Sequence, residues 1–225
     1  MNLFTISDLH LSFGTDKPMN IFRGWDNHTE RIKANWCRMI KDDDIVVLPG
    51  DLSWGLKIEE TLEDFKFLDS LPGKKIILKG NHDLWWGTVT KLKEFFEKND
   101  IKTIDILFNN AFSCGKYAIA GTRGWFLEEG NDKKVIDREA GRLEASITEA
   151  EKIGLEILVF LHYPPVYGDS VCTEITDVLK KHNIKRVFHG HIHGAGLNKA
   201  VKEYEGIEYK LVSCDCIDFT PFYII

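Results

Sequence analysis

The chain alternates short, β-branched apolar runs with longer stretches in which apolar residues recur at helical spacing. Such alternation predicts strands and helices in turn, which is typical of α/β proteins. The first half is expected to contain strands at residues 3–7, 44–48 and 75–78 and helices at residues 30–40, 58–71 and 88–98. Thr88 is the expected N-cap of the last of these helices, because its hydroxyl can accept a hydrogen bond from the first turn.

The order of elements changes in the middle of the chain. Apolar runs at residues 103–108, 111–113 and 117–120 follow one another with only short turn sequences between them, which predicts antiparallel hairpins. Asp137 is the expected N-cap of the next helix. The remaining expected elements are helices at 138–153 and 173–181 and strands at 157–161, 186–188, 206–214 and 222–225. Two mixed sheets with helices outside would bury these apolar faces, in one domain that spans residues 1–225.

Composition narrows the class of protein. A chain of 225 residues, 44% of them hydrophobic, can bury one substantial core and is short for two domains. No apolar run approaches the roughly 20 residues of a membrane helix, and residues 1–8 lack the basic start and apolar stretch of a signal peptide. Five scattered cysteines favour reduced thiols in a cytoplasm. Cys214 and Cys216 form a close pair, but no further cysteine or histidine follows to complete a metal site.

Polar clusters follow five of the expected strands. These clusters are Asp8-Leu9-His10, Gly50-Asp51, Gly80-Asn81-His82-Asp83, His162 and Gly190-His191-Ile192-His193. In open α/β sheets the ligand site lies at the carboxyl ends of the strands, so the topology brings these clusters together. Carboxylate, imidazole and amide ligands without thiolate suit Mn, Fe, Zn or Mg. Taken alone, Asp8 has another interpretation, as a loop carboxylate that caps a helix.

In these motifs the chain resembles the calcineurin-like metallophosphoesterase family, from residue 8 to residue 193. The resemblance implies a four-layer α/β/β/α sandwich and two divalent metal ions, with manganese favoured. It implies that Asp8, His10 and His193 hold one metal, that Asn81, His162 and His191 hold the other, and that Asp51 lies between them. It also implies that His82 is the catalytic histidine, with Asp83 as its partner.

Physical chemistry supports that assignment independently. A bridging carboxylate such as Asp51 lets two cations approach to about 3.5–4 Å, the spacing at which both can act on one phosphorus. Two divalent cations with two aspartates and a bridging hydroxide keep a net positive charge, which attracts a phosphate even to a protein of formal net charge −6. The bridging hydroxide would attack phosphorus, and His82 would donate a proton to the departing oxygen. A purely structural role for His82 is the alternative.

Substrate contacts are predicted from fewer observations. Trp54 and Trp85 follow strand ends and could stack on a base or an aryl group, or they could pack loops onto the sandwich. Arg123 follows a strand and could clamp a phosphate, or it could be a surface arginine. Residues 122–136 are long and polar enough for a lid, or for a plain solvated loop.

The remaining histidines carry weaker expectations. His28 is expected at the surface, and His182 is expected to be solvated near the end of a helix. For His189 two interpretations stay open, as a group that supports a ligand or as an ordinary buried histidine.

One departure from part of the family narrows the range of expected substrates. Phosphoprotein phosphatases of this family follow the bridging aspartate with Asp-Arg-Gly, whereas here Leu52, Ser53 and Trp54 follow it. We therefore expect a small phosphodiester or phosphomonoester, nucleotide-like compounds included, with diesters ranked first. The alternatives are a non-catalytic scaffold that binds a protein partner and a nuclease. A nuclease would need a basic track to the site, and no dense Lys/Arg run lies near the clusters, so nucleic acid is an unlikely partner. The sequence leaves the oligomeric state open.

Overall fold

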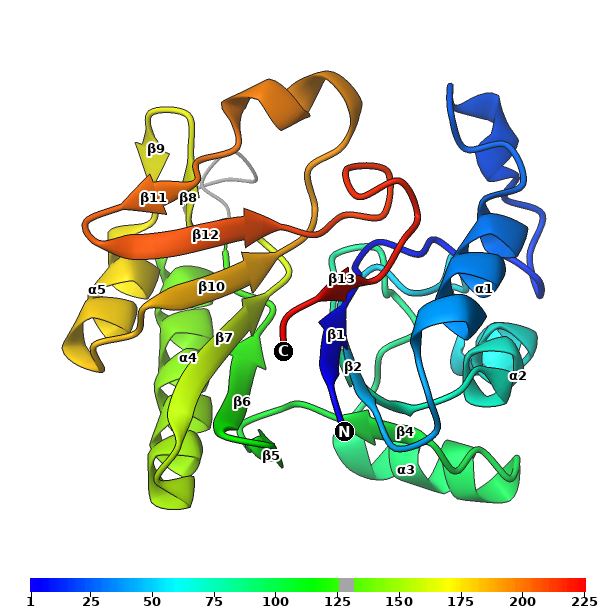
Figure 1. Cartoon of the computed structure of the whole chain (residues 1–225), viewed down its shortest axis with the longest axis horizontal. Coiled ribbons are helices and arrows are strands. Elements are labelled where there is room, and N and C mark those ends of the chain that lie inside the picture. The colour runs from blue at the N-terminus through cyan, green and yellow to red at the C-terminus, as the bar shows by residue number, and fades with distance from the viewer. Residues whose placement is uncertain (126–131) are drawn as a thin grey trace.

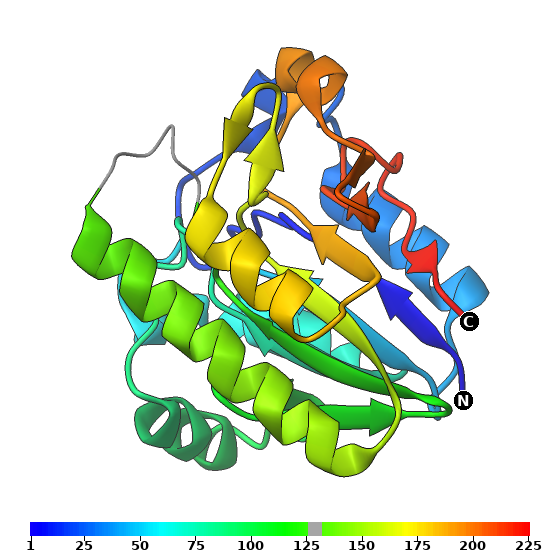
Figure 2. The ribbon, with the colours of Figure 1, turned by 90° about the vertical axis from the view of Figure 1, so that its left-hand side faces the viewer.

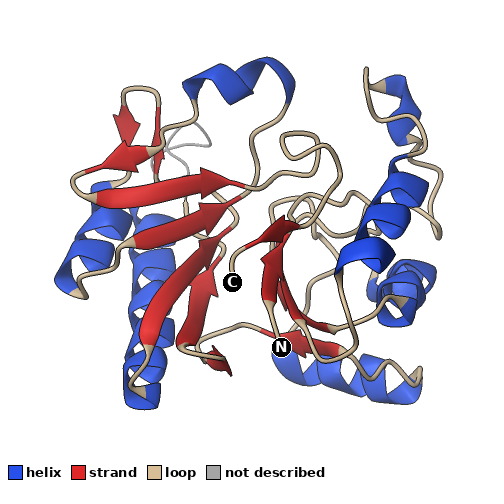
Figure 3. Ribbon diagram, viewed as in Figure 1, coloured by secondary structure: helices blue, strands red, loops and turns tan. Residues whose placement is uncertain are grey.

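The computed structural model describes residues 1–125 and 132–225. Two large β-sheets face each other, and helices cover the outer face of each sheet (Figures 1 and 3). This arrangement confirms the predicted α/β/β/α sandwich.

The first sheet carries the N-terminal half of the site. Its five strands lie in the order β13-β1-β2-β3-β4, and all neighbours are parallel except β13 and β1. The bounds are β1 (Leu3–Thr5), β2 (Ile45–Pro49), β3 (Lys74–Leu78), β4 (Ile104–Ile106) and β13 (Phe222–Tyr223). Parallel strands covered on both faces need nearly continuous apolar runs, which β2 supplies with five buried residues.

The second sheet has six strands in the order β11-β12-β10-β7-β6-β5. Its inner strands are parallel, and β5 and β11 are antiparallel to their neighbours. The bounds are β5 (Phe112–Cys114), β6 (Tyr117–Thr122), β7 (Glu156–Leu161), β10 (Arg186–His189), β11 (Glu203–Tyr204) and β12 (Ile207–Leu211). A separate hairpin joins β8 (Val166–Tyr167) to β9 (Ser170–Val171).

Helices complete the layers. The first sheet is covered by α1 (His28–Met39), α2 (Leu62–Ser70) and α3 (Val89–Lys98), and the second by α4 (Lys133–Ile153) and α5 (Thr173–Lys181), as Figure 2 shows for the second pair. Short 3-10 helices are η1 (Met19–Ile21), η2 (Ile58–Thr61) and η4 (Gly194–Lys199). Alternate residues of one strand serve different layers: Phe4 packs towards the helices, whereas Leu3 packs between the sheets with Phe160.

Two expectations about the middle of the chain were wrong. The run at 103–108 does not form a hairpin with the next one, because β4 pairs in parallel with β3 in the first sheet, and only β5 and β6 form a hairpin. Helix α4 begins earlier than expected, at Lys133, because the side chain of Asp132 caps it by accepting hydrogen bonds from the backbone N–H groups of Lys134 and Val135. Asp137 lies inside the helix and pairs with Lys133 at 2.9 Å.

Other expectations were confirmed or refined. The hydroxyl of Thr88 accepts a hydrogen bond from the N–H of Lys91, as expected of the N-cap. The last long strand stops at Leu211, so Cys214 and Cys216 lie in the turn after it, and both thiols are free. Within the described part of the chain, no helix has the length and apolar character needed to cross a bilayer.

Candidate metal centre

The loops that leave the strands at their carboxyl ends bring the predicted ligands together. Asp8 and His10 follow β1, Asp51 follows β2, and Asn81 follows β3 in the first sheet. His162 follows β7, and His191 and His193 follow β10 in the second sheet. Five strand ends from two sheets therefore supply one site, as the strand-end pattern predicted.

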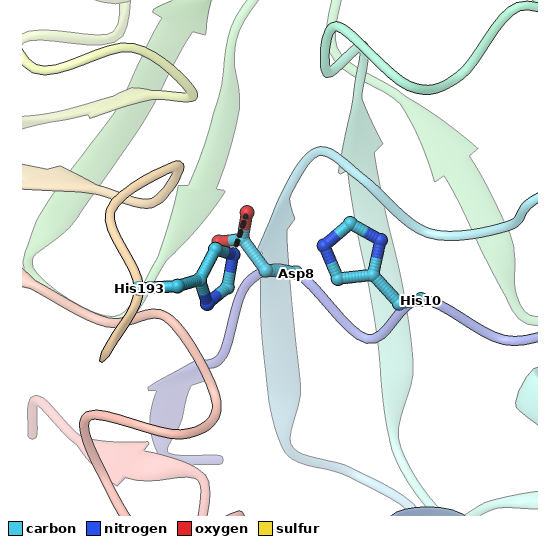
Figure 4. A group of neighbouring side chains, drawn as sticks. All are labelled: Asp8, His10 and His193. Atoms are coloured by element: carbon cyan, nitrogen blue, oxygen red, sulfur yellow. Dashed lines mark hydrogen bonds and ion pairs between the residues drawn. The ribbon is translucent and has the colours of Figure 1, made fainter. Parts of the chain in front are cut away.

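One group of ligand atoms comes from Asp8, His10 and His193, whose candidate donor atoms lie within 4.8 Å of one another (Figure 4). The Nε2 atom of His193 is 3.3 Å from Oδ1 of Asp8. The other ring nitrogen of His193, Nδ1, is 2.8 Å from a carboxylate oxygen of Asp215. A histidine that donates one N–H to a carboxylate presents its second nitrogen as a metal ligand, so this geometry fits a divalent cation.

A second group consists of Asp51, His162 and His191, again with candidate donor atoms within 4.8 Å. The amide oxygen of Asn81 is 2.6 Å from Nε2 of His162 and 2.9 Å from Nδ1 of His191. His162 directs Nδ1 to the carbonyl oxygen of Pro49 at 3.0 Å, which fixes Nε2 as the nitrogen that faces the site. Separations near 3 Å between donor atoms suit a cation held at about 2.0–2.2 Å from each.

Asp51 lies between the two groups. Its Oδ2 atom is 3.5 Å from Nε2 of His162 and 3.9 Å from Nε2 of His10. Its Oδ1 atom accepts a hydrogen bond of 2.8 Å from the backbone N–H of His82, which fixes the orientation of the carboxylate. One carboxylate that faces candidate ligands of both groups could contact a cation in each of them.

The backbone at these positions is unusual. Four ligands, Asp8, His10, Asp51 and His191, have positive φ angles of 60°, 46°, 53° and 73°. Non-glycine residues with positive φ cost free energy and cluster at functional sites, where the surrounding fold enforces them. The strand ends therefore turn sharply inward at the ligands themselves.

Neighbouring glycines allow the loops to approach one another closely. Of the three glycines that directly precede a candidate ligand, Gly50 has a positive φ, of 87°. Gly80 and Gly190 are required for a different reason, because there is no space for a side chain at either position. A Cβ at Gly80 would lie 2.1 Å from Oδ1 of Asp51, and a Cβ at Gly190 would lie 2.2 Å from Oδ2 of Asp8. A side chain at either position would displace a carboxylate ligand.

Burial and mutual charge define the electrostatics of the site. Burial lowers the pKa of His162 to about 4 and that of His191 to about 3, so both imidazoles are neutral near pH 7 and have a lone pair for a metal. His193 differs: burial lowers its pKa, but the carboxylates of Asp8 and Asp215 raise it to about 10. Burial and the nearby charge of Asp8 raise the pKa of Asp51. Carboxylates that favour a proton on His193 would equally favour a bound cation.

His82 and Asp83 have different environments. His82 is exposed, and its ring lies 4.6 Å from the ring of Trp54 and 5.6 Å from that of His10, between centroids. Asp83 is fully buried, and its carboxylate accepts hydrogen bonds from the backbone N–H groups of Gly80, Asp51, Leu52 and Ser53. Those contacts hold the loop that carries Asp51.

An aromatic pocket opens beside the first group of ligands. It has a volume of about 410 Å³, and its walls are His10, Met19, Phe22, Arg23, Trp25, Trp54, His82, His193, Gly194 and Asp215. The ring of Trp54 stacks on that of His10 with centroids 4.8 Å apart, and its indole N–H points to the sulfur of Met19 at 3.2 Å. The pocket thus joins candidate metal ligands, the exposed His82 and an apolar wall.

The other two predicted substrate contacts lie elsewhere. Trp85 is 4% exposed, and its ring meets that of Phe65 edge-on in the core, so it packs a loop onto the sandwich. Arg123 lies outside the aromatic pocket, in a separate one, where its guanidinium is 3.4 Å from the carboxylate of Glu139. Part of the expected lid, residues 126–131, falls outside the described residues, and residues 133–136 belong to α4.

Three further histidines were weakly predicted. His28 is buried, contrary to expectation, because its ring packs against Trp25. His182 is not solvated: its ring nitrogens lie 2.7 Å from Glu151 and 3.0 Å from Glu144, and its side chain is 8% exposed. His189 is fully buried beside the site, and burial lowers its pKa to about 4.

The residues that sequence reasoning missed are Asp215, Met19, Phe22 and Arg23. Asp215 lies beyond the last recognised motif, between two cysteines that drew attention for another reason. Met19, Phe22 and Arg23 have no periodic signal and reach the site only because the loop after β1 folds back over it. A carboxylate soon after a β-strand was the single available signal for Asp215.

Comparison with known proteins identifies relatives that match most of the chain. A family model described as calcineurin-like phosphoesterase matches residues 1–195. The chain is 27% identical over 203 residues to a Fibrobacter succinogenes protein named "Probable cyclic nucleotide phosphodiesterase", covering 84% of this chain and 71% of that one.

Solved structures share the fold at low identity. A protein from Thermus thermophilus has a TM-score of 0.58 at 13% identity, with 99% of this chain and 97% of that chain covered. A protein of unknown function from Aquifex aeolicus has a TM-score of 0.57 at 20% identity, with 99% and 95% covered. Phosphopantetheinyl hydrolase from Mycobacterium tuberculosis has a TM-score of 0.52 at 15% identity, with 94% and 88% covered.

The family match spans most of the chain and includes every candidate ligand from Asp8 to His193. It is a family of enzymes that hydrolyse phosphate esters with two metal ions, and this chain has two candidate metal-binding clusters. The protein is accordingly a metal-dependent phosphoester hydrolase, and the chain belongs to the calcineurin-like phosphoesterase family.

Proposed function

We propose that this enzyme hydrolyses small phosphodiesters and, more slowly, phosphomonoesters, with nucleotide-like compounds among its substrates. The observation that carries the proposal is the position of Asp51, whose one carboxylate oxygen faces His162 at 3.5 Å and His10 at 3.9 Å. That position suits a bridge between two cations that act on one phosphoryl group. In this proposal Asp8, His10 and His193 hold one cation, and Asn81, His162 and His191 hold the other.

The two cations, when bound, supply Lewis acidity that neutralises charge on the phosphate and acidifies an attacking water. The protein supplies orientation. Asp215 holds the ring of His193 through Nδ1, and the carbonyl of Pro49 holds that of His162. Asp83 keeps the Asp51 loop in place through four backbone hydrogen bonds. Positioning of this kind accounts for much of the catalysis of phosphoryl transfer.

His82 is the proposed proton donor to the departing oxygen. It is exposed, and it lines the same aromatic pocket as the ligands His10 and His193, so a leaving group in that pocket would lie within its reach. An alkoxide is a poor leaving group unless a proton arrives as the P–O bond breaks, which makes this donor important for alkyl esters.

The aromatic pocket supports the proposed substrate class. Trp25 and Trp54 offer flat apolar walls to a base or an aryl group, and Arg23 is the cation at its rim. The name of the Fibrobacter succinogenes relative points the same way, to a phosphodiester of a nucleotide. The absence of an Asp-Arg-Gly element after Asp51 argues against phosphoproteins.

We also propose manganese as the preferred metal and the cytoplasm as the location. The ligands are nitrogen and oxygen atoms, a set that manganese shares with iron, zinc and magnesium. All five cysteines are free thiols, as in proteins of a reducing compartment.

The test is hydrolysis of bis(p-nitrophenyl) phosphate beside p-nitrophenyl phosphate, with protein stripped of metal and then resupplied with Mn²⁺ or Mg²⁺. The proposal expects turnover that returns with metal and is faster on the diester. A faster monoester would reverse the ranking of substrates. Protein that binds no metal would favour the scaffold alternative, and tight, salt-sensitive binding of DNA or RNA would favour a nuclease.

A further inference from the structure

A second pocket shares no wall with the aromatic pocket. It has a volume of about 640 Å³ and lies where the end of β3, the start of α3 and the first half of α4 meet. Its walls include Lys79, Trp86, Phe108, Arg123, Arg138 and Arg142. We refer to it as the basic pocket, because four of these residues are cationic.

The charges of the basic pocket do not balance. Among the described residues that line it, Glu139 is the only acid, and it faces Lys79, Arg123, Arg138 and Arg142. The carboxylate of Glu139 is completely buried and lies 2.6 Å from Arg142, 3.4 Å from Arg123 and 3.9 Å from Arg138. One carboxylate cannot neutralise four cations, so the described residues that line the pocket carry a formal excess of three positive charges in a protein of formal net charge −6.

One hydrogen-bond donor of a residue that lines the basic pocket is also without a partner among the described residues. The Nε–H of Arg123 is buried and has no hydrogen-bond partner in the described part of the chain. A buried guanidinium N–H without a partner is energetically unfavourable. The side chain of Arg142 is two-thirds buried against Phe108, with its guanidinium 5.0 Å from the ring centre, which holds it over the pocket.

The start of α3 adds to the positive field. Gly87, Thr88 and Val89, the residues that open this ten-residue helix, form one wall of the basic pocket. Backbone N–H groups of a first helical turn attract anions, and the start of α3 borders the same space as the arginines. Trp86 and Phe108 provide apolar walls beside them.

We propose that the basic pocket binds a small polyanion that carries two linked phosphate groups. A diphosphate has roughly three negative charges near pH 7, which matches the excess of the pocket. Arginine forks bind phosphate oxygens in pairs, so two phosphates engage Arg123, Arg138 and Arg142 better than one does. The volume of about 640 Å³ leaves room for an organic group against Trp86 and Phe108. This site is separate from the proposed hydrolysis and does not depend on it.

The basic pocket borders the second group of metal ligands. The carbonyl oxygen of Arg123 accepts hydrogen bonds from the backbone N–H groups of His162 at 3.1 Å and Tyr163 at 2.9 Å. Lys79 directly precedes Gly80 and Asn81 in the chain. A ligand on these cations would therefore rest on the backbone that carries His162 and Asn81.

Calorimetric titration of pyrophosphate into the full chain tests this proposal. Metal is first removed with a chelator, and the chelator, itself a polyanion, is removed by desalting. Without metal the catalytic site lacks the cations that would otherwise attract the probe. The expected result is saturable binding of pyrophosphate at least tenfold tighter than that of orthophosphate. Equal affinity for the two anions, or no saturable heat, would overturn the proposal.

Variants distinguish binding in the basic pocket from nonspecific electrostatic attraction of pyrophosphate to the protein. Arg138→Gln removes a half-exposed side chain whose ion pair with Glu139 is long, at 3.9 Å, so the fold is preserved. It should weaken pyrophosphate binding at least fivefold, and Arg142→Gln at least tenfold. The matched control is Arg38→Gln, an exposed residue of α1 that bonds to Asn35, with an unchanged dissociation constant expected. Equal affinity in Arg138→Gln and the native protein would contradict the assignment.

Discussion

The carboxylate of Asp83 accepts a hydrogen bond from the backbone N–H of Asp51 at 2.9 Å. Asp83 also accepts from the N–H groups of Gly80, Leu52 and Ser53. In return, Asp51 accepts a hydrogen bond from the N–H of His82 at 2.8 Å. The loops after β2 and β3 are thus cross-linked by two buried carboxylates, and the position of the proposed bridge depends on a residue that does not face the metals.

Replacement of Asp83 by asparagine should loosen this link. One acceptor oxygen becomes an NH₂ group that faces two N–H donors, so two hydrogen bonds are lost inside the protein. The free energy of unfolding in urea should fall by about 1–3 kcal/mol, and metal affinity should fall with it. Asp105→Asn, an exposed change on β4, is the matched control. Native stability and native metal content in Asp83→Asn would contradict this role.

Much of the candidate metal centre was predictable because its residues follow apolar strands directly. Asp8, Asp51 and His162 each come within a few residues of a run that is buried in the sheet, so strand assignment and the strand-end rule together predict that they lie at one site. Asp215 was not predictable in this way. It supports His193 from a segment 22 residues later in the chain, and its contact exists only after β12 has paired with β10.

Asp215 should act as a positioning residue for His193. Asp215→Asn removes the carboxylate that accepts from Nδ1, and the first metal should then bind roughly 10–100-fold more weakly, as is usual when such a partner is lost. Titration of metal-free protein with Mn²⁺ measures this directly. Asp218→Asn, an exposed aspartate three residues further on that pairs with Arg31, should bind metal normally. Equal metal affinity in the two variants would show that Asp215 has no such role.

Replacement of His82 and replacement of Asp51 should impair the enzyme in different ways. His82→Ala should keep both metals but lose turnover by roughly 10²–10⁴-fold on an alkyl ester, whose leaving oxygen needs a proton. The loss should be much smaller on a p-nitrophenyl ester, whose leaving group departs as a stable anion. Asp51→Ala should lose turnover on both substrates together with bound metal. A loss in His82→Ala that is independent of the leaving group would contradict proton donation.

The strand pairing in the middle of the chain was not predictable from local pattern. Short turns join the runs at 103–108, 111–113 and 117–120, and short turns usually mean hairpins. Here the first run pairs with β3, because its Ile104 and Ile106 complete the core under α3, while Phe112 and Cys114 pack between the sheets. Which sheet a strand joins depends on burial across the whole fold, which local spacing does not contain.

Gly80 and Gly141 allow a matched comparison between a crowded glycine at the site and an uncrowded glycine away from it. A Cβ at Gly80 would lie 2.1 Å from Oδ1 and 2.3 Å from the backbone N of Asp51, so Gly80→Ala should displace the proposed bridge and abolish turnover. Gly141 is an exposed position inside α4 with nothing within 4 Å of an added Cβ. Gly141→Ala should raise the free energy of unfolding by about 0.5–1 kcal/mol and leave turnover unchanged. Full turnover in Gly80→Ala would contradict the proposed role of Asp51.

Lys75 should make stability depend on pH in the alkaline range. It is completely buried on β3, where its ammonium donates hydrogen bonds to the carbonyl of Leu71 and to the hydroxyl of Thr103. Burial lowers its pKa from 10.5 to about 8, and the charge of Asp69 offsets only part of that effect. Below pH 8 both the folded and the unfolded chain hold the proton, so the cost of burying the charge is constant there.

Between about pH 8 and 10.5 the unfolded chain keeps a proton that the folded chain has released, so the free energy of unfolding should rise with pH. For this shift the rise is about 3 kcal/mol. Urea unfolding of the native protein and of Lys75→Met across this range isolates it, because the other alkaline titrations are common to both. Lys75→Met should lack the rise, so its stability relative to the native protein should fall as pH increases. A difference that stays constant from pH 7 to 10 would mean that Lys75 titrates normally despite its burial.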